Sequence, residues 1–164
     1  MLVSYLIVLY KMDSNEINMF AKLLKLHPFL GVYAADQLCN IKKDELGVLV
    51  CNTQPSYEPG EHWIGICLTK SKLIYFDSLN GDFHKSQYLQ YFLKEMGKDF
   101  LRNDIQIQNY GSDKCGIHAL VFCYVLSQQK NCAVYVRFLS SFSSHKLKLR
   151  EELSLNYFLL TLEL

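Results

Sequence analysis

Four residues of this chain have the side chains that nucleophilic catalysis requires, and each stands at the edge of an expected secondary-structure element. His62 begins an apolar run, Asp77 ends the next one, and Gln108 and Cys115 flank a short polar stretch further on. A thiolate becomes a strong nucleophile beside an imidazole, and a carboxylate fixes the tautomer of that imidazole. A glutamine amide can donate to the oxyanion that forms when a thiolate adds to a carbonyl. These residue types indicate acyl transfer through a covalent intermediate.

Cys115 stands where an expected helix over residues 115–126, "CGIHALVFCYVL", begins. The dipole and unpaired amides of a helix N-terminus favour a thiolate, and a neighbouring protonated histidine favours it further. Gly116 lets backbone amides approach a substrate carbonyl without an intervening side chain. Cys67 and Cys123 lie on apolar faces, and we expect them to be inert core residues.

His62 and Asp77 are expected to be neighbours across a β-hairpin. The β-rich runs 62–69 and 72–78 are separated by two residues, so the second strand returns toward the start of the first. A hairpin centred between positions 70 and 71 places Asp77 opposite residue 63 or 64, next to His62. A lone histidine or aspartate at a strand end is usually structural, and only the joint pattern of the four residues indicates catalysis.

The remaining pattern predicts helices and strands that position these residues. An amphipathic helix over 14–26, capped by Asp13 or Ser14, comes first. The other expected elements are a strand at 46–53, a helix at 85–96 closed by Gly97, a short strand at 105–109, and one or two C-terminal helices. This order predicts an α+β fold with a small, mostly antiparallel or mixed sheet packed against helices.

Composition excludes several other classes of protein. With 17 Lys+Arg and 16 Asp+Glu among 164 residues, the net charge of +1 offers no bulk attraction for nucleic acid or anionic membranes. The six cysteines are dispersed and no secretory signal precedes them, which favours reduced thiols over a disulfide framework. Their spacing matches no zinc motif, so we expect no metal site.

Residues 1–11, "MLVSYLIVLYK", form an apolar N-terminal extension ahead of an expected single domain over residues 12–164. The apolar run is too short to span a bilayer as a helix, and it lacks the basic region of a signal peptide. An edge strand, a disordered lead and a misassigned start codon all remain open. We expect a protein that is neither secreted nor bound to a membrane.

The chain from position 12 to about 126 resembles the adenovirus-type cysteine proteases, the adenain group of the Ulp1-like clan. The resemblance rests on "EHWIGICL", "YFDSLN" and "QNYGSDKCGIHAL", in the chain order His, acid, Gln, Cys. It implies the Ulp1/adenain-like cysteine protease fold. It also implies that His62 is the general base, Asp77 its orienting acid, Gln108 an oxyanion donor and Cys115 the nucleophile.

Three features depart from the adenain pattern. Asp77 stands where adenoviral enzymes have Glu, as in the cellular SUMO proteases, and His118 occupies a position that is normally apolar. His118 either perturbs the nearby thiol or is tolerated there. The resemblance also implies activation by a disulfide-linked peptide and by DNA, but no cysteine lies near Gly97 for that link and the net charge does not favour DNA.

The pattern and the resemblance together predict a cysteine endopeptidase that requires no cofactor. The resemblance implies a viral maturation protease, in the host nucleus or cytoplasm or in the virion, that cleaves capsid or core precursor proteins after small residues such as glycine. The first alternative is a protease of SUMO, ubiquitin or a similar modifier, whose partners are modifier conjugates. The second is a non-catalytic binding protein that retains the fold.

Overall fold

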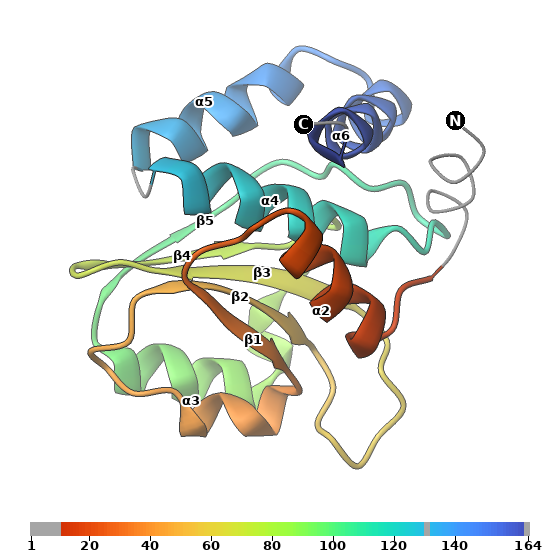
Figure 1. Ribbon diagram of the computed structural model, residues 1–164. Helices are drawn as coiled ribbons and strands as arrows, with labels where there is room; N and C mark the ends of the chain where they lie inside the picture. Colours follow the sequence, from red (N-terminus) through yellow and green to blue (C-terminus); the bar gives the residue numbers. More distant parts are fainter. Residues whose placement is uncertain (1–10, 130–131, 163–164) are drawn as a thin grey trace.

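A mixed five-stranded sheet forms the centre of this computed structural model, which describes residues 11–129 and 132–162 (Figure 1). The strands lie in sequence order across the sheet: β1 (Phe29–Tyr33), β2 (Gly47–Asn52), β3 (Trp63–Leu68), β4 (Lys72–Phe76) and β5 (Asp99–Arg102). The central pairs β2–β3 and β3–β4 are antiparallel, whereas the outer pairs β1–β2 and β4–β5 are parallel. The predicted α+β class with a mixed sheet is confirmed.

Helices cover both faces of the sheet (Figure 1). The helices are α2 (Ser14–Leu23), α3 (Gln87–Met96), α4 (Cys115–Gln129), α5 (Cys132–Ser143) and α6 (Leu147–Leu162), with 3-10 helices η1 (Ala35–Asn40) and η2 (Phe83–Lys85). Helix α4 packs directly on one face with α2, α5 and α6 around it, and α3 and η1 cover the other face. Within residues 11–129 and 132–162, no helix is long and apolar enough to cross a membrane.

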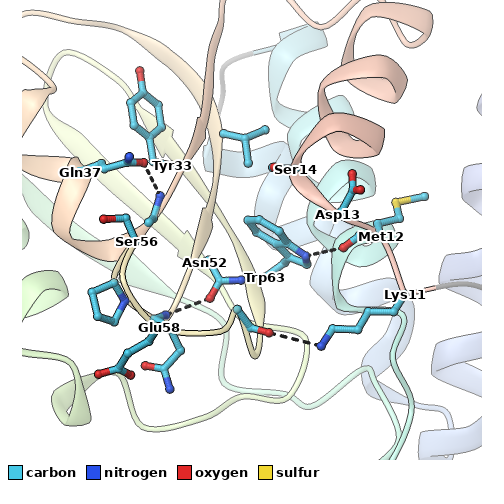
Figure 2. A pocket seen from close by; sticks show the side chains of 15 residues that line it. Lys11, Met12, Asp13, Ser14, Tyr33, Gln37, Asn52, Ser56, Glu58 and Trp63 are labelled. Atoms are coloured by element: carbon cyan, nitrogen blue, oxygen red, sulfur yellow. Dashed lines mark hydrogen bonds between the residues drawn. The ribbon is translucent and has the colours of Figure 1, made fainter.

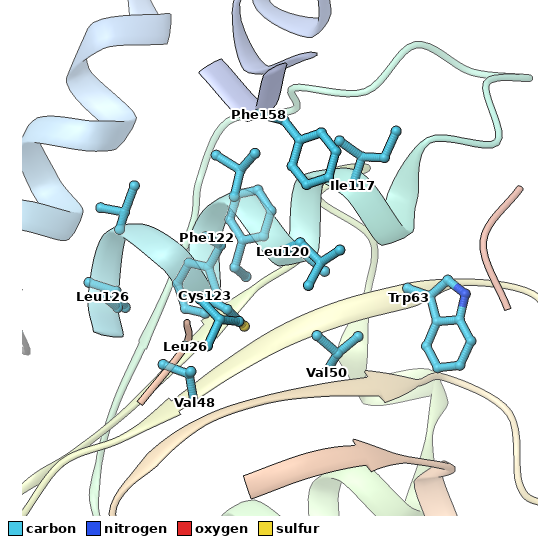
Figure 3. Close-up of a cluster of buried hydrophobic side chains, with 14 of the residues drawn as sticks. Leu26, Val48, Val50, Trp63, Ile117, Leu120, Phe122, Cys123, Leu126 and Phe158 are labelled. Atoms are coloured by element: carbon cyan, nitrogen blue, oxygen red, sulfur yellow. The ribbon is translucent and has the colours of Figure 1, made fainter. Parts of the chain in front are cut away.

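The central strands are apolar at almost every position because alternate side chains enter two different cores. In β2, Val48 and Val50 point to the core around α4, whereas Leu49 and Cys51 point to the core around α3. Figure 3 shows the first of these cores, where Val48 and Val50 lie beneath side chains of α4. A sheet buried on both faces loses the alternation of apolar and polar residues that a half-exposed sheet keeps.

The close contact between α4 and the sheet depends on a glycine in β3. A Cβ atom built on Gly65 would lie 2.3 Å from Cδ1 of Phe122, a separation shorter than real carbon contacts. The Phe122 ring in turn stacks on Phe76 of β4, with ring centroids 5.1 Å apart. Gly65 therefore sets the distance between the helix that begins at Cys115 and the strand that follows His62.

We expect Gly65→Ala to destabilise the protein by about 1–3 kcal/mol, because the added methyl group overpacks the core. Urea denaturation followed by circular dichroism would measure this loss. Phe122→Ala removes the ring atoms that the methyl group would meet, so the double variant should be more stable than the sum of the two single effects predicts. Strictly additive losses would contradict this role of Gly65.

Two helix predictions are confirmed in substance. Asp13 caps α2, accepting a hydrogen bond from the Glu16 amide at 2.9 Å, while the Glu16 carboxylate accepts one from the Asp13 amide. Helix α2 ends at residue 23 instead of 26, because Lys25 takes a left-handed φ of 52°. Gly97, with φ of 59°, closes α3 as expected.

The strand predicted at residues 105–109 is wrong, and the last strand is β5, a few residues earlier. The amides of Ile107 and Gln108 both donate to the carbonyl of Ser78, at 2.8 and 2.9 Å, so the segment crosses the end of β4 instead of pairing along it. Strand β1 was not predicted from the sequence, although it pairs with β2 in parallel.

The prediction for the N-terminal extension lies almost entirely outside the described residues, which begin at position 11. Lys11 donates through Nζ to the Gly60 carbonyl at 3.3 Å, and the side chain of Met12 is buried. The division into an extension and a domain over residues 12–164 stays a prediction.

Candidate active site

His62 and Asp77 meet at the open end of the β3–β4 hairpin. Gly65 pairs with Phe76, so continuing the register places Asp77 opposite Ile64, as predicted, and diagonal to His62 on the same face. Nε2 of His62 and Oδ1 of Asp77 are 2.6 Å apart. A histidine just before one strand and an aspartate just after its partner are thereby held by the sheet itself.

Backbone amides and a buried asparagine hold Asp77 in place. Its carboxylate accepts hydrogen bonds from the amides of Leu79 and Gly81, at 2.8 and 2.9 Å. Asn103 is bonded to the backbone of Asp77 on both sides, accepting from its N–H at 2.9 Å and donating to its carbonyl at 2.6 Å. Burial raises the pKa of Asp77, but the contact with His62 and the two amides outweigh burial and hold the pKa below its usual value.

Cys115 is the first residue of α4, and its thiol contacts the imidazole of His62. Burial lowers the pKa of His62, but its contacts with Asp77 and Cys115 outweigh burial and raise the pKa to about 9. Since Asp77 occupies Nε2, Nδ1 is the ring nitrogen left for the thiol. The structure therefore brings three of the four predicted residues into one chain of contacts: Asp77, His62 and Cys115.

The raised pKa of His62 predicts a stability that depends on pH. The pKa of His62 is about 9 in the folded protein and 6.5 for an ordinary histidine, so the stabilisation is fully present below pH 6.5 and is lost as the pH rises through 9. The loss is about 3 kcal/mol. The contact with His62 also contributes to the lowered pKa of Asp77 and is counted here only once.

Urea unfolding of the wild type and of His62→Gln at several pH values would measure this loss. The stability difference between the two proteins should shrink between pH 6.5 and 9, and other titrating groups cancel in that difference. A difference that stays constant across this range would contradict the raised pKa.

Gln108 is buried beside this group and is held in one orientation. Ser78, the residue after Asp77, donates through its hydroxyl to Oε1 of Gln108 at 2.7 Å. Nε2 donates to the carbonyl of Ser112, which can only accept and therefore fixes which end of the amide is nitrogen. An amide nitrogen carries two hydrogens, so one remains to donate to an oxyanion.

The other described cysteines differ in how far their thiols are exposed to solvent. Cys67 and Cys123 are buried in the core beneath α4, as predicted, and burial raises the pKa of the Cys123 thiol well above its usual value. Cys51 is buried on the other face of the sheet, and its pKa is raised by burial as well. Cys39 is the exposed free thiol among the described residues. Cys115, which is 3% exposed, is the described thiol that contacts a histidine.

The structure gives Gly116 a different role from the predicted one. A Cβ atom on Gly116 would lie 3.1 Å from Cβ of Met12 and 3.5 Å from Cδ1 of Ile17. The absent side chain therefore makes room for the residues that begin α2, and not for a substrate carbonyl.

Two hollows lie near the predicted site residues. The first, of about 510 Å³, is lined by Met12 and Trp63, whose indole N–H donates to the Met12 carbonyl at 2.8 Å (Figure 2). It lies near the start of α4, because Met12 also packs against Gly116. The second, of about 750 Å³, is lined by residues that include His62 and Asp77.

Sequence reasoning missed Asn103 and left His118 unexplained. No local pattern marks Asn103, because its partner lies 26 residues away. His118 is buried between α4 and α6, with Nδ1 2.8 Å from Oγ of Ser154, so its side chain is directed to α6. Across residues 11–129 and 132–162, no group of three or more His, Cys, Asp or Glu side chains could hold a metal ion.

Comparison with known proteins gives a structural neighbour but no family. No protein-family model and no curated protein matches the chain. Among solved structures, an AvrA deletion variant with IP6 and CoA is similar, with 14% sequence identity and a TM-score of 0.48. The match covers 79% of this chain and 56% of that one, so the chain spans little more than half the length of that structure. The support for the site therefore comes from this chain's own residues.

Proposed function

We propose that the protein is a cysteine endopeptidase. The observation that carries this proposal is the contact chain from Asp77 through His62 to Cys115, with 2.6 Å between the carboxylate and the imidazole. A core histidine would not need a buried carboxylate on one side and a thiol at a helix N-terminus on the other. This arrangement is the one that activates a thiol for attack on a carbonyl.

In the proposed reaction, Cys115 starts as a thiolate paired with protonated His62, as the raised pKa of His62 favours, and this thiolate attacks the scissile carbonyl. Gln108 and the backbone N–H of Cys115, in the first turn of α4, donate to the oxyanion. The protonated His62 then transfers its proton to the leaving amine, and water activated by His62 hydrolyses the acyl-enzyme. Cys115, His62 and Gln108 supply the nucleophile, the base and an oxyanion donor, so the proposal includes no metal or organic cofactor.

The proposed substrates are proteins with small residues, such as glycine, before the cut. Cys115 is 3% exposed, so bulky side chains next to the scissile bond would have little room. The hollow beside Met12 and Trp63 is the place that we propose for the substrate segment next to the cut. By the resemblance described above, we propose viral capsid or core precursors as the substrates.

A proteome-derived peptide library would test the proposal. The wild type and Cys115→Ala would each be incubated with the library, and new termini would be identified by mass spectrometry. We expect cleavages by the wild type alone, with glycine or another small residue before the cut. Identical sets of termini from the two proteins would reject the endopeptidase.

A modifier protease is a second candidate because the acid that contacts His62 is an aspartate, as in the SUMO proteases. SUMO and ubiquitin that carry a C-terminal electrophile would separate the two candidates. Rapid labelling of Cys115 by either protein probe, together with poor cleavage of the peptide library, would favour the modifier protease. Peptide cleavage without labelling by the protein probes would favour the endopeptidase.

A further inference from the structure

The first half of α6 contacts the loop that joins Gln108 to Cys115. Glu151 accepts a hydrogen bond from Nδ2 of Asn109, and the side chain of Ser112 also bonds to its carboxylate. The carbonyl of Ser112 accepts the hydrogen bond from Nε2 of Gln108. Ser112 therefore links Glu151 to Gln108, the proposed oxyanion donor, because it bonds to both residues.

Arg150, the residue before Glu151 in α6, also contacts the segment around Gln108. Arg150 donates through Nη1 to the Gln106 carbonyl at 3.0 Å, and through Nε to the His145 carbonyl at 2.7 Å. Arg150 and Glu151 therefore contact the chain on both sides of Gln108. Here we call residues 106–112 the oxyanion loop.

On its other side, Glu151 faces α4. Oε1 of Glu151 lies 3.8 Å from Nε2 of His118, and both atoms are buried without a hydrogen-bond partner among the described residues. Burial raises the pKa of Glu151, but the nearby His118 and the hydrogen bonds from Ser112 and Asn109 outweigh burial and lower the pKa to about 2. The side chain at position 151 is therefore a carboxylate at neutral pH, held between the catalytic helix and the oxyanion loop.

We propose that Glu151 is a positioning residue that holds the oxyanion loop, and through Ser112 the amide of Gln108, against the helix that carries Cys115. This proposal rests on the proposed function. It also assigns a role to His118, which lies against Glu151 and Ser154 and fixes α6 on α4. The C-terminal helix is then part of the catalytic apparatus and not only a cover for the core.

Glu151→Ala tests this role, with peptide cleavage as the measure. Loss of an oxyanion donor costs about 10²–10³-fold in kcat, and a displaced donor should cost less, about 10–100-fold, with KM changed little. Glu151→Gln keeps one acceptor oxygen for Asn109 and should recover part of the loss. Glu152→Ala, an exposed position on the same helix, is the matched control and should match the wild type.

A double variant separates positioning from a merely structural effect. If Glu151 acts through Gln108, Glu151→Ala should add little to the loss already caused by Gln108→Ala. Equal fold-losses in the two backgrounds, or an unchanged kcat in Glu151→Ala, would overturn the proposal. If Glu151→Ala does not fold, the same comparison is made with Glu151→Gln.

Amide hydrogen exchange of the oxyanion loop provides a readout that does not depend on turnover. The amides of residues 109–112 should exchange at least tenfold faster in Glu151→Ala than in Glu152→Ala, and unchanged exchange would overturn the proposal. Absence of any turnover that depends on Cys115 would instead reject the proposed function, and the exchange rates would still decide whether Glu151 holds the loop.

Discussion

Cys115→Ala is expected to lose all measurable peptide cleavage, a fall on the order of 10⁶-fold in kcat, as is typical when the nucleophile of a covalent hydrolase is removed. The physical reason is that no other described thiol combines a helix N-terminus with contact to a histidine. The alanine variant should fold, because the change removes one atom from a residue at the edge of the core. Steady-state cleavage of a peptide selected from the library would measure the loss.

Cys39→Ala is the matched control for this variant, since Cys39 is a free thiol that is exposed to solvent. Its kcat and KM should equal those of the wild type. Residual activity of Cys115→Ala within tenfold of the wild type would contradict the assignment of the nucleophile.

His62→Ala is expected to lose about 10⁴–10⁶-fold in kcat, because the variant lacks both the base for the thiol and the acid for the leaving amine. The double variant with Cys115→Ala should be no worse than the worse single variant, since residues that act as a unit do not add. Peptide cleavage by these slow variants would be measured over long incubations at high enzyme concentration, with samples quenched at intervals.

His27→Ala, an exposed histidine beyond the end of α2, is the control for this change and should retain full activity. Additive losses in the double variant would show that His62 and Cys115 work independently. That outcome would contradict a shared catalytic step.

The positions of His62, Asp77 and Cys115 could be predicted because each stands at the boundary of an element that its local sequence specifies. The hairpin register that joins His62 to Asp77 follows from two apolar runs and a two-residue connection, and the observed pairing of Gly65 with Phe76 lies within the predicted range. Cys115 begins α4 as expected. Catalytic roles for these residues stay predictions until they are tested by activity.

The parts that could not be predicted depend on contacts between distant segments. Alternating Ile and Gln at residues 105–108 is typical of an edge strand, but both amides of this segment bond to one carbonyl, that of Ser78. Glu151 meets Asn109 across 42 positions of the sequence, and α6 has no local feature that marks it as part of a site. His118 became explicable only once α6 was placed beside it.

Covalent labelling with a short peptide that ends in glycine and an electrophile tests the central claim most directly, because Cys39 competes as an exposed thiol and Cys115 is 3% exposed. Peptide mapping by mass spectrometry would locate the adduct in the wild type and in His62→Ala. We expect one adduct, on Cys115, that forms rapidly in the wild type and at least 100-fold more slowly in His62→Ala. Labelling of Cys39 in preference to Cys115, or an equal rate on Cys115 in both proteins, would contradict a thiol activated by His62.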